Sequence, residues 1–215
     1  MRDGFAEIDT TDAERVLERM LGPMVGGVVG VLRSDDPARA IDLSEAAISA
    51  GLACIEITWT TPGAAGVVRT LRERHPGLLI GAGSVFDDDD VASARGAGAE
   101  FVVSPHLSER VSAACAALAL PYVPGVATAS EVVRAMETGH QLVKLFPIAQ
   151  LGGPAFVRAL RGPVPTLRAM VTGGVAPEDL ASYREAGAAL VGLGSIFGRD
   201  ASETYDRVAT LMRGR

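Results

Sequence analysis

The chain has 215 residues, of which 48% are hydrophobic and 21% are charged, a composition typical of a globular protein with one large core. Its formal net charge is −6 and it has no cluster of basic residues, which argues against nucleic acid and anionic membrane surfaces as partners. Residues 1–11 lack the apolar segment of a signal peptide, and no apolar stretch has the length of a membrane span.

The two cysteines, Cys54 and Cys115, each lie within a strongly apolar segment. Their spacing matches neither a metal site nor a disulfide framework, and free thiols are typical of a reducing compartment. We therefore expect the protein to be cytoplasmic.

Eight short apolar runs recur along the chain, each followed by a loop and a longer segment rich in alanine, glutamate and arginine. The runs do not alternate with polar residues, and continuous apolar strands indicate a parallel sheet that is buried on both faces. They occupy residues 27–32, 53–58, 78–81, 101–104, 122–125, 142–146, 168–172 and 190–194.

The segments between these runs begin and end with the residues that favour helix termini. Asp36 followed by Pro37 predicts a helix over residues 38–50, with Gly51 just past its end. Similar patterns predict helices over residues 108–119, 130–138 and 176–187, and an additional helix over residues 12–21 before the first strand.

The repeat of about 20–25 residues fits one βα unit. Eight such units predict an α/β protein with a closed (β/α)8 TIM barrel and an extra N-terminal helix. No linker or low-complexity tract interrupts the pattern, so we predict a single domain over residues 1–215. An open, doubly wound sheet is the alternative fold. In a barrel, the site lies at the carboxyl ends of the strands.

Lys144 is the only lysine, since the other 19 of the 20 basic residues are arginines. It lies within the apolar run 142–146, where burial of an ammonium costs several kcal/mol and favours the neutral amine. A neutral amine is a nucleophile suited to a Schiff base with a carbonyl substrate. The alternative is a strand-end lysine that reaches water along its stem.

Glu56 lies in another apolar run, where a carboxylate has to face the barrel interior or pair with a second group. Lys144 is the obvious partner if both side chains point inward. A carboxylate beside an amine can move the protons that carbinolamine formation, dehydration and C–C cleavage require. The alternative is a structural ion pair, although such a pair at the mouth of a barrel is itself a candidate site.

Other candidate residues follow the strands. Gly173-Gly174 and Gly194-Ser195 follow the seventh and eighth runs, and loops at these positions form a recurrent phosphate site in barrels because glycine lets backbone amides approach an anion. Ser84 follows the third run and could donate to a carboxylate. Arg33 ends the first run, and its planar guanidinium suits a carboxylate or phosphate ligand. The alternative is that Arg33 is a surface charge at the rim of the barrel.

The four consecutive aspartates from Asp87 to Asp90 superficially suggest a metal site. Consecutive carboxylates do not converge on one ion, and their position is typical of a helix N-terminus. We therefore expect no metal ion at these aspartates. Metal-dependent catalysis is disfavoured as well, because no histidine and carboxylate ligands are clustered at strand ends.

In their order along the chain, these motifs resemble the 2-keto-3-deoxy-6-phosphogluconate (KDPG) and 4-hydroxy-2-oxoglutarate aldolases. The resemblance extends from residue 25 to about residue 197, and the motifs are weak singly but specific as an ordered set. They are Val28-Val29-Gly30-Val31-Leu32-Arg33, Ile55-Glu56-Ile57-Thr58, Gly81-Ala82-Gly83-Ser84-Val85, Ser104-Pro105-His106, Val123-Pro124-Gly125-Val126, Lys144-Leu145-Phe146-Pro147, Thr172-Gly173-Gly174-Val175 and Gly194-Ser195.

The resemblance implies a homotrimeric class I aldolase that needs no metal and no cofactor, and it leaves a metal-dependent pyruvate aldolase as a disfavoured alternative. The class I enzyme reversibly cleaves a 2-keto-3-deoxy sugar acid, here a 6-phosphorylated one, to pyruvate and an aldehyde such as glyceraldehyde 3-phosphate. The matching positions make Lys144 the Schiff-base lysine and Glu56 the acid/base. The implied substrate-binding positions are Ser84 at the pyruvate carboxylate, Thr172 along the substrate chain, Gly173, Gly174, Gly194 and Ser195 at the phosphate, and Phe146 and Pro105 as pocket walls.

The chain departs from the family pattern at two places. Some members have an arginine where this chain has Thr60, and we expect Arg33 to take over recognition of the substrate carboxylate, with Thr60 kept in the predicted substrate-binding set. Many members have a glutamate shortly after Phe-Pro, where this chain has Ile148-Ala149-Gln150. The second departure leaves the native substrate open.

Two alternative functions remain from the sequence. One is a 4-hydroxy-2-oxoglutarate aldolase, which would release pyruvate and glyoxylate. The other is a phosphate-ligand-binding or isomerase barrel without covalent chemistry, in which Lys144 is only a charge partner. Because many barrels share the phosphate site, the fold does not decide between an aldolase and such a non-covalent barrel, whereas covalent capture of a substrate at Lys144 does.

Overall fold

The strands form one closed parallel barrel. The computed structural model describes residues 10–22 and 25–214, so the polar segment 1–9, where no signal peptide is expected, lies outside the described residues. Within them, nine strands follow the order β5-β4-β3-β2-β1-β9-β8-β7-β6, and all neighbours are parallel. The strands are β1 (Val28–Leu32), β2 (Cys54–Thr58), β3 (Leu79–Gly83), β4 (Phe101–Val103), β5 (Tyr122–Val123), β6 (Gly125–Val126), β7 (Val143–Leu145), β8 (Ala169–Val171) and β9 (Leu190–Leu193).

The two strands at the ends of this order belong to one extended segment. Val123 in β5 pairs with β4, while Gly125 in β6 pairs with β7. Pro124 lies between them and has no N–H to donate, although its carbonyl accepts from the Lys144 amide at 2.8 Å. The expected single fifth strand is therefore split in two, and the sheet closes through it. The predicted (β/α)8 barrel is confirmed, and the open sheet is wrong.

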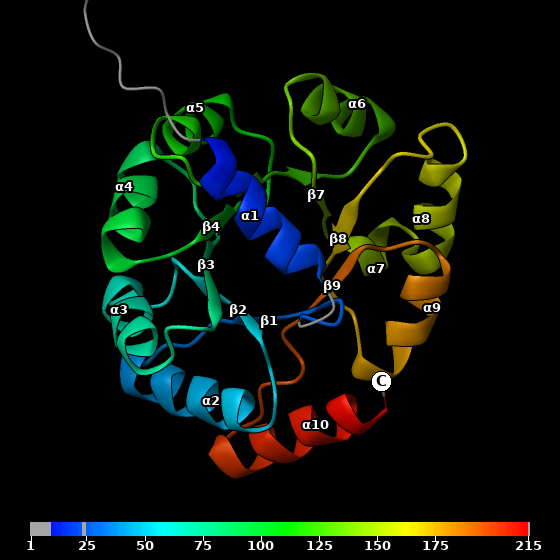
Figure 1. Cartoon of the computed structure of the whole chain (residues 1–215). Coiled ribbons are helices and arrows are strands. Elements are labelled where there is room, and N and C mark those ends of the chain that lie inside the picture. Colours follow the sequence, from blue (N-terminus) through cyan, green and yellow to red (C-terminus); the bar gives the residue numbers. More distant parts are fainter. Residues whose placement is uncertain (1–9, 23–24, 215) are drawn as a thin grey trace, which may run out of the picture.

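Helices surround the barrel (Figure 1). Asp36 caps α2 by accepting from the Ala38 amide, and Asp87 caps α4 by accepting from the Asp90 amide, as the sequence predicts for both. The segment expected as a helix over 176–187 opens as a 3-10 turn, η1. The helical elements are α1 (Thr10–Leu21), α2 (Pro37–Ser49), α3 (Ala64–Arg74), α4 (Asp88–Ala97), α5 (Glu109–Ala117), α6 (Ala129–Glu137), α7 (Ile148–Leu151), α8 (Gly153–Arg161), η1 (Pro177–Asp179), α9 (Leu180–Glu185) and α10 (Ala201–Arg213).

Two hydrophobic clusters hold these layers together. The larger one lies between the outer face of the sheet and the surrounding helices. The smaller one fills the barrel interior with side chains such as Leu79, Phe101 and Met170, and it includes Met20 from α1. The predicted extra helix is confirmed, and it crosses the amino-terminal end of the barrel (Figure 1). No helix in the described part of the chain is long and apolar enough to cross a membrane.

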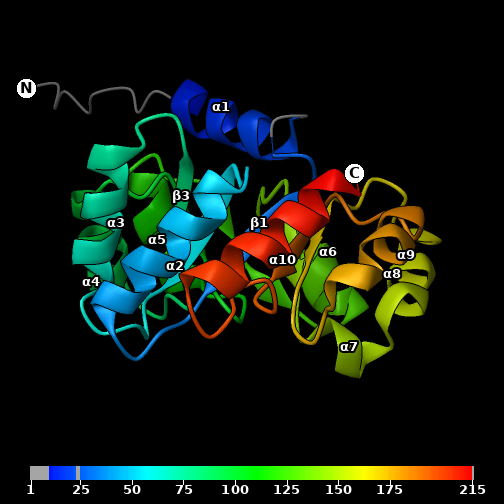
Figure 2. The ribbon, with the colours of Figure 1, turned by 90° about the horizontal axis from the view of Figure 1, so that it is seen from below.

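The interior changes from apolar to polar along the barrel. Side chains two residues apart on a strand point to the same face. Cys54 and Leu142 belong to the apolar cluster, and Glu56 and Lys144, two residues further along β2 and β7, are buried polar groups. Figure 2 shows α1 on one side of the molecule and α7, which follows the carboxyl end of β7, on the other. The polar layer therefore lies at the end opposite α1.

Candidate active site

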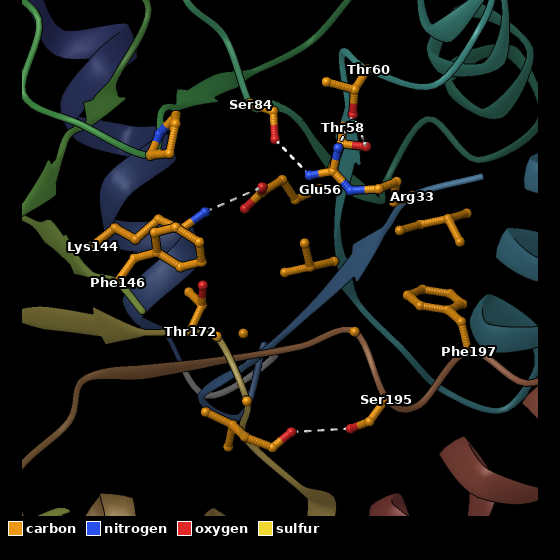
Figure 3. Close-up of a pocket in the computed structure, with 18 of the residues that line it drawn as sticks. Arg33, Glu56, Thr58, Thr60, Ser84, Lys144, Phe146, Thr172, Ser195 and Phe197 are labelled. Atoms are coloured by element: carbon orange, nitrogen blue, oxygen red, sulfur yellow. Dashed lines mark hydrogen bonds and ion pairs between the residues drawn. The ribbon is translucent and has the colours of Figure 1, made fainter. Parts of the chain in front are cut away.

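A cavity of about 570 Å³ opens at the carboxyl ends of the strands. It brings together all the residues that the sequence singled out as catalytic or substrate-binding (Figure 3). They are Arg33, Glu56, Thr60, Ser84, Pro105, Lys144, Phe146, Thr172, Gly173, Gly174, Gly194 and Ser195. The roles assigned to these residues stay predictions. Their location around one cavity is what a shared active site requires.

Lys144 and Glu56 face each other inside the cavity (Figure 3). Lys144 Nζ lies 3.7 Å from Glu56 Oε1, and the two side chains are 6% and 1% exposed. At this distance the two groups form an ion pair, but they are too far apart for a hydrogen bond. Neither carboxylate oxygen of Glu56 accepts a hydrogen bond within the described residues. Because buried polar groups are rarely left unpaired, both oxygens are free to accept a proton or a hydrogen bond from a group that enters the cavity.

Gly83 provides the surface against which the Glu56 side chain lies. A Cβ atom at position 83 would lie 1.9 Å from Glu56 Oε1 and 2.5 Å from its Cγ. Any larger residue at position 83 would therefore push the carboxylate away from its present place. The sequence placed Gly83 only within a glycine-containing loop. It could not predict the close contact, because this contact depends on the rotamer of the Glu56 side chain.

Arg33 extends across the mouth of the cavity. One of its terminal nitrogens donates to Thr60 Oγ1 and the other donates to Ser84 Oγ at 3.1 Å (Figure 3). The side chain therefore reaches from the end of β1 to the loops after β2 and β3. Arg33 thus lines the cavity from the end of the first strand, and its guanidinium lies against Thr60.

The glycine loops after β8 and β9 meet at the opposite wall of the cavity. Ser195 Oγ donates to the Val175 carbonyl at 3.1 Å and joins the two loops (Figure 3). Gly173 has a φ of 94°, and a Cβ there would lie 2.9 Å from the Phe146 ring and from Pro147. Only glycine suits both the left-handed backbone and this close approach. The loops therefore expose backbone rather than side chains to the cavity.

The cysteines offer no competing nucleophile. Both are buried free thiols. Burial raises the pKa of Cys54 well above its usual range, with a further contribution from the charge of Glu56. Burial also raises the pKa of Cys115 to about 12. Neither thiol is a thiolate near neutral pH, and the thiolate is the reactive form.

Sequence reasoning missed several residues that line the cavity. Thr58 could have been found, because it lies two residues after Glu56 on the same strand face. Arg39 lines the cavity from helix α2, and Phe197 and Gly198 do so from the loop after β9; no motif marks them. In the described residues, no group of three His, Cys, Asp or Glu side chains could hold a metal ion.

A closed barrel with a buried amine, a buried carboxylate and a cavity at the carboxyl ends of its strands is the architecture of a barrel enzyme. Residues 24–211 match a family model described as KDPG and KHG aldolase. The chain belongs to this aldolase family.

Individual relatives agree with the family assignment. The 2-dehydro-3-deoxy-phosphogluconate aldolase of Treponema pallidum (strain Nichols) is 38% identical over 156 residues, which cover 73% of this chain and 74% of that protein. The KDPG aldolase of Zymomonas mobilis ZM4, solved with 3-phosphoglycerate, is 26% identical with a TM-score of 0.82 over 94% of this chain and 95% of that one. The Legionella pneumophila enzyme, solved with pyruvate as a covalent carbinolamine intermediate, is 28% identical with a TM-score of 0.78 over 87% and 93%.

Proposed function

We propose that this chain is a class I aldolase that reversibly cleaves a 2-keto-3-deoxy-6-phosphogluconate-like sugar acid to pyruvate and an aldehyde such as glyceraldehyde 3-phosphate. The observation that carries the proposal is the buried Lys144 Nζ, 3.7 Å from the Glu56 carboxylate in the cavity. The covalent carbinolamine with pyruvate in the Legionella pneumophila relative supports it. An aldolase of this class needs no metal or organic cofactor.

Lys144 forms and breaks the bonds to the substrate. After the Lys144 ammonium has given a proton to Glu56, the neutral amine attacks the C2 ketone to form a carbinolamine, and loss of water gives the protonated imine. The C3–C4 bond then breaks, and its electron pair moves into the imine and leaves an enamine. Protonation of the enamine at C3 and hydrolysis of the imine release pyruvate and return the amine.

Glu56 moves the protons that these steps require. It first delivers the proton taken from Lys144 to the carbinolamine hydroxyl, which leaves as water, and it then accepts the proton of the C4 hydroxyl as the aldehyde leaves. It gives that second proton to C3 of the enamine, and during imine hydrolysis it moves a proton from the attacking water to the departing amine. Its two carboxylate oxygens have no hydrogen-bond partner within the described residues. They are therefore available to the substrate without the loss of an existing hydrogen bond.

The remaining residues bind the two ends of the substrate. Arg33 and Ser84 bind the carboxylate next to C2, and Thr60 holds Arg33. Thr172 contacts the substrate chain between C3 and C6, while Phe146 and Pro105 form the walls. The backbone amides of Gly173, Gly174, Gly194 and Ser195 bind the 6-phosphate, which suits loops that present backbone to the cavity.

The steric role of Gly83 gives one prediction. Gly83→Ala is expected to displace the Glu56 carboxylate and lower kcat by about 100-fold, the scale of losing a positioned acid/base group. The matched control is Gly66→Ala on α3, where a Cβ would meet nothing within 4 Å and activity should be unchanged. Steady-state cleavage rates and thermal melts of both variants check it. A fully active Gly83→Ala would show that Glu56 does not need its present position.

The protein is further proposed to be a single-domain, cytoplasmic homotrimer whose partners are small molecules. The trimer follows from the family resemblance, and the half-exposed Phe86 at the rim of the cavity is an apolar side chain that a second copy could cover. The buried free thiols suit a reducing compartment. Light scattering of the purified protein should give three times the mass of the chain, and a monomer would contradict the trimer.

A substrate comparison tests the proposed function. Pyruvate release would be measured with KDPG, with its unphosphorylated analogue and with 4-hydroxy-2-oxoglutarate. The glycine loops predict a kcat/KM at least about tenfold higher for the phosphorylated substrate, because hydrogen bonds to a charged group contribute about 1.5–3 kcal/mol. The family description also includes KHG, so preference for 4-hydroxy-2-oxoglutarate would assign glyoxylate as the aldehyde. Release from none of the three would contradict the proposal.

A further inference from the structure

A chain of threonine hydroxyls connects the guanidinium of Arg33 to the backbone next to it. Arg33 donates to Thr60 Oγ1, and Thr60 donates to Thr58 Oγ1 at 3.2 Å. The Thr58 and Thr61 hydroxyls are 3.3 Å apart, and Thr61 Oγ1 also accepts from the Ser34 amide at 3.2 Å. The hydrogen bonds therefore form a loop that leaves the chain at the side chain of residue 33 and returns to it at residue 34.

The cation orients the outer part of this chain. Arg33 can only donate, so Thr60 accepts from it and donates its own proton to Thr58. The Thr58 and Thr61 hydroxyls share the next hydrogen bond, in which either can be the donor. Hydrogen bonds that run in one direction polarise one another, most strongly in a low-dielectric environment. Thr58 and Thr61 are 1% and 2% exposed, so the inner part of the chain is shielded from water. It therefore presents a polarised acceptor, Thr60 Oγ1, to the guanidinium.

A second contact fixes the plane of the guanidinium. Ser84 Oγ accepts from the other terminal nitrogen of Arg33 at 3.1 Å. Because its two hydrogen-bond acceptors lie on different loops, the guanidinium cannot rotate freely. Its remaining N–H groups stay available to a ligand. An arginine that is already ordered loses less conformational entropy when it binds an anion.

We propose that Thr58, Thr60 and Thr61 are positioning residues that hold Arg33 ready for the carboxylate of a 2-oxo acid. This proposal rests on the proposed function and adds to it the origin of carboxylate selectivity. Thr60 stands at the position where the family resemblance places an arginine in some members. Thr61 is not among the residues that line the cavity, and the Thr60 hydroxyl is already bonded to Arg33 and Thr58. Their effect should therefore reach the substrate through Arg33 and be specific for its charged end.

The test compares pyruvate with pyruvamide, a neutral analogue that keeps the ketone. Borohydride trapping on the purified full-length chain gives the half-saturating concentration of each. Thr60→Val and Thr61→Val remove one hydroxyl each and nearly keep the shape of the side chain. Both are expected to raise the half-saturating concentration of pyruvate about tenfold, the scale of one hydrogen bond to a charged group. The value for pyruvamide and the extent of labelling at saturation should stay within about twofold of the unmodified chain.

Conservative and distant variants serve as controls. Thr60→Ser and Thr61→Ser should restore pyruvate affinity, because they restore the hydroxyls. Arg33→Ala sets the largest effect that the chain of hydroxyls can have. Thr138→Val, which removes a surface hydroxyl that donates to a helix carbonyl on α6, should leave both probes unchanged. Thr60→Val keeps the Ser34 amide paired, so it remains informative if Thr61→Val fails to fold.

The outcomes separate this inference from the proposed function. Absence of labelling in the unmodified chain would overturn the aldolase mechanism itself. Labelling of the unmodified chain, with an unchanged pyruvate-to-pyruvamide ratio in Thr60→Val, would overturn the positioning role alone. Equal weakening of both probes would also overturn it, since it would mean a general structural effect rather than an effect on Arg33.

Discussion

Lys144→Arg is expected to abolish turnover, a loss of about 10⁴-fold or more, which is the scale of removing a covalent nucleophile. Arginine keeps a positive charge near Glu56, which lies 3.7 Å from the lysine Nζ in the native chain. Its guanidinium remains protonated and cannot form the imine. The barrel should stay folded because the charge pair is kept. Pyruvate release from the phosphorylated substrate, followed with purified protein, measures the effect.

A second variant separates loss of chemistry from loss of structure. In Lys144→Met, the methionine side chain has a similar length to lysine but no amine. It also avoids the extra bulk of arginine at a nearly buried position. Circular dichroism and thermal melts should show that at least one of the two variants folds like the native chain. Substantial aldol cleavage by a folded Lys144 variant would contradict the Schiff-base mechanism.

Glu56→Gln is expected to lower kcat by about 10²- to 10⁴-fold, the usual contribution of a general acid/base. The KM should change only a few-fold, because the carboxylate acts in proton transfer rather than in holding the substrate. Glutamine keeps the size of the side chain but cannot accept the C4 hydroxyl proton. Steady-state kinetics on the purified variant give both parameters.

The control for this change is Glu109→Gln. Glu109 is 77% exposed and pairs with Arg134 on the surface of the next helix, and surface pairs of this kind contribute little to stability or activity. Its kinetics should match the native chain. If Glu56→Gln instead raised KM and left kcat unchanged, Glu56 would be a binding residue and another group would have to move the protons.

The sequence predicted the barrel because its strands carry a strong and regular pattern. Each apolar run is buried on both faces, which leaves few alternatives to a closed parallel sheet. The same pattern made Lys144 and Glu56 conspicuous, since a charged residue inside such a run has to face the interior. The structure brings their side chains to 3.7 Å, as expected from two inward-pointing positions near the carboxyl ends of their strands.

Other features could not be predicted, because they depend on side-chain rotamers and on local backbone breaks. The division of the fifth strand at Pro124 follows from the missing N–H, but the apolar run around it hides the break. The contact between Gly83 and Glu56 and the hydroxyl chain behind Arg33 require three-dimensional placement. Arg39 reaches the cavity from a helix, whereas the sequence pattern draws attention to strand ends.

The most direct test of the aldolase assignment is borohydride reduction in the presence of saturating pyruvate, with the product analysed by intact mass and peptide mapping. The chain contains one lysine, so the α-amino group is the only other amine that could react. A single reduced pyruvyl adduct on Lys144 is the result that the Schiff-base mechanism predicts. A folded protein with no adduct, or with an adduct only on the α-amino group, would contradict that mechanism and leave Lys144 as a charge partner in a phosphate-binding barrel.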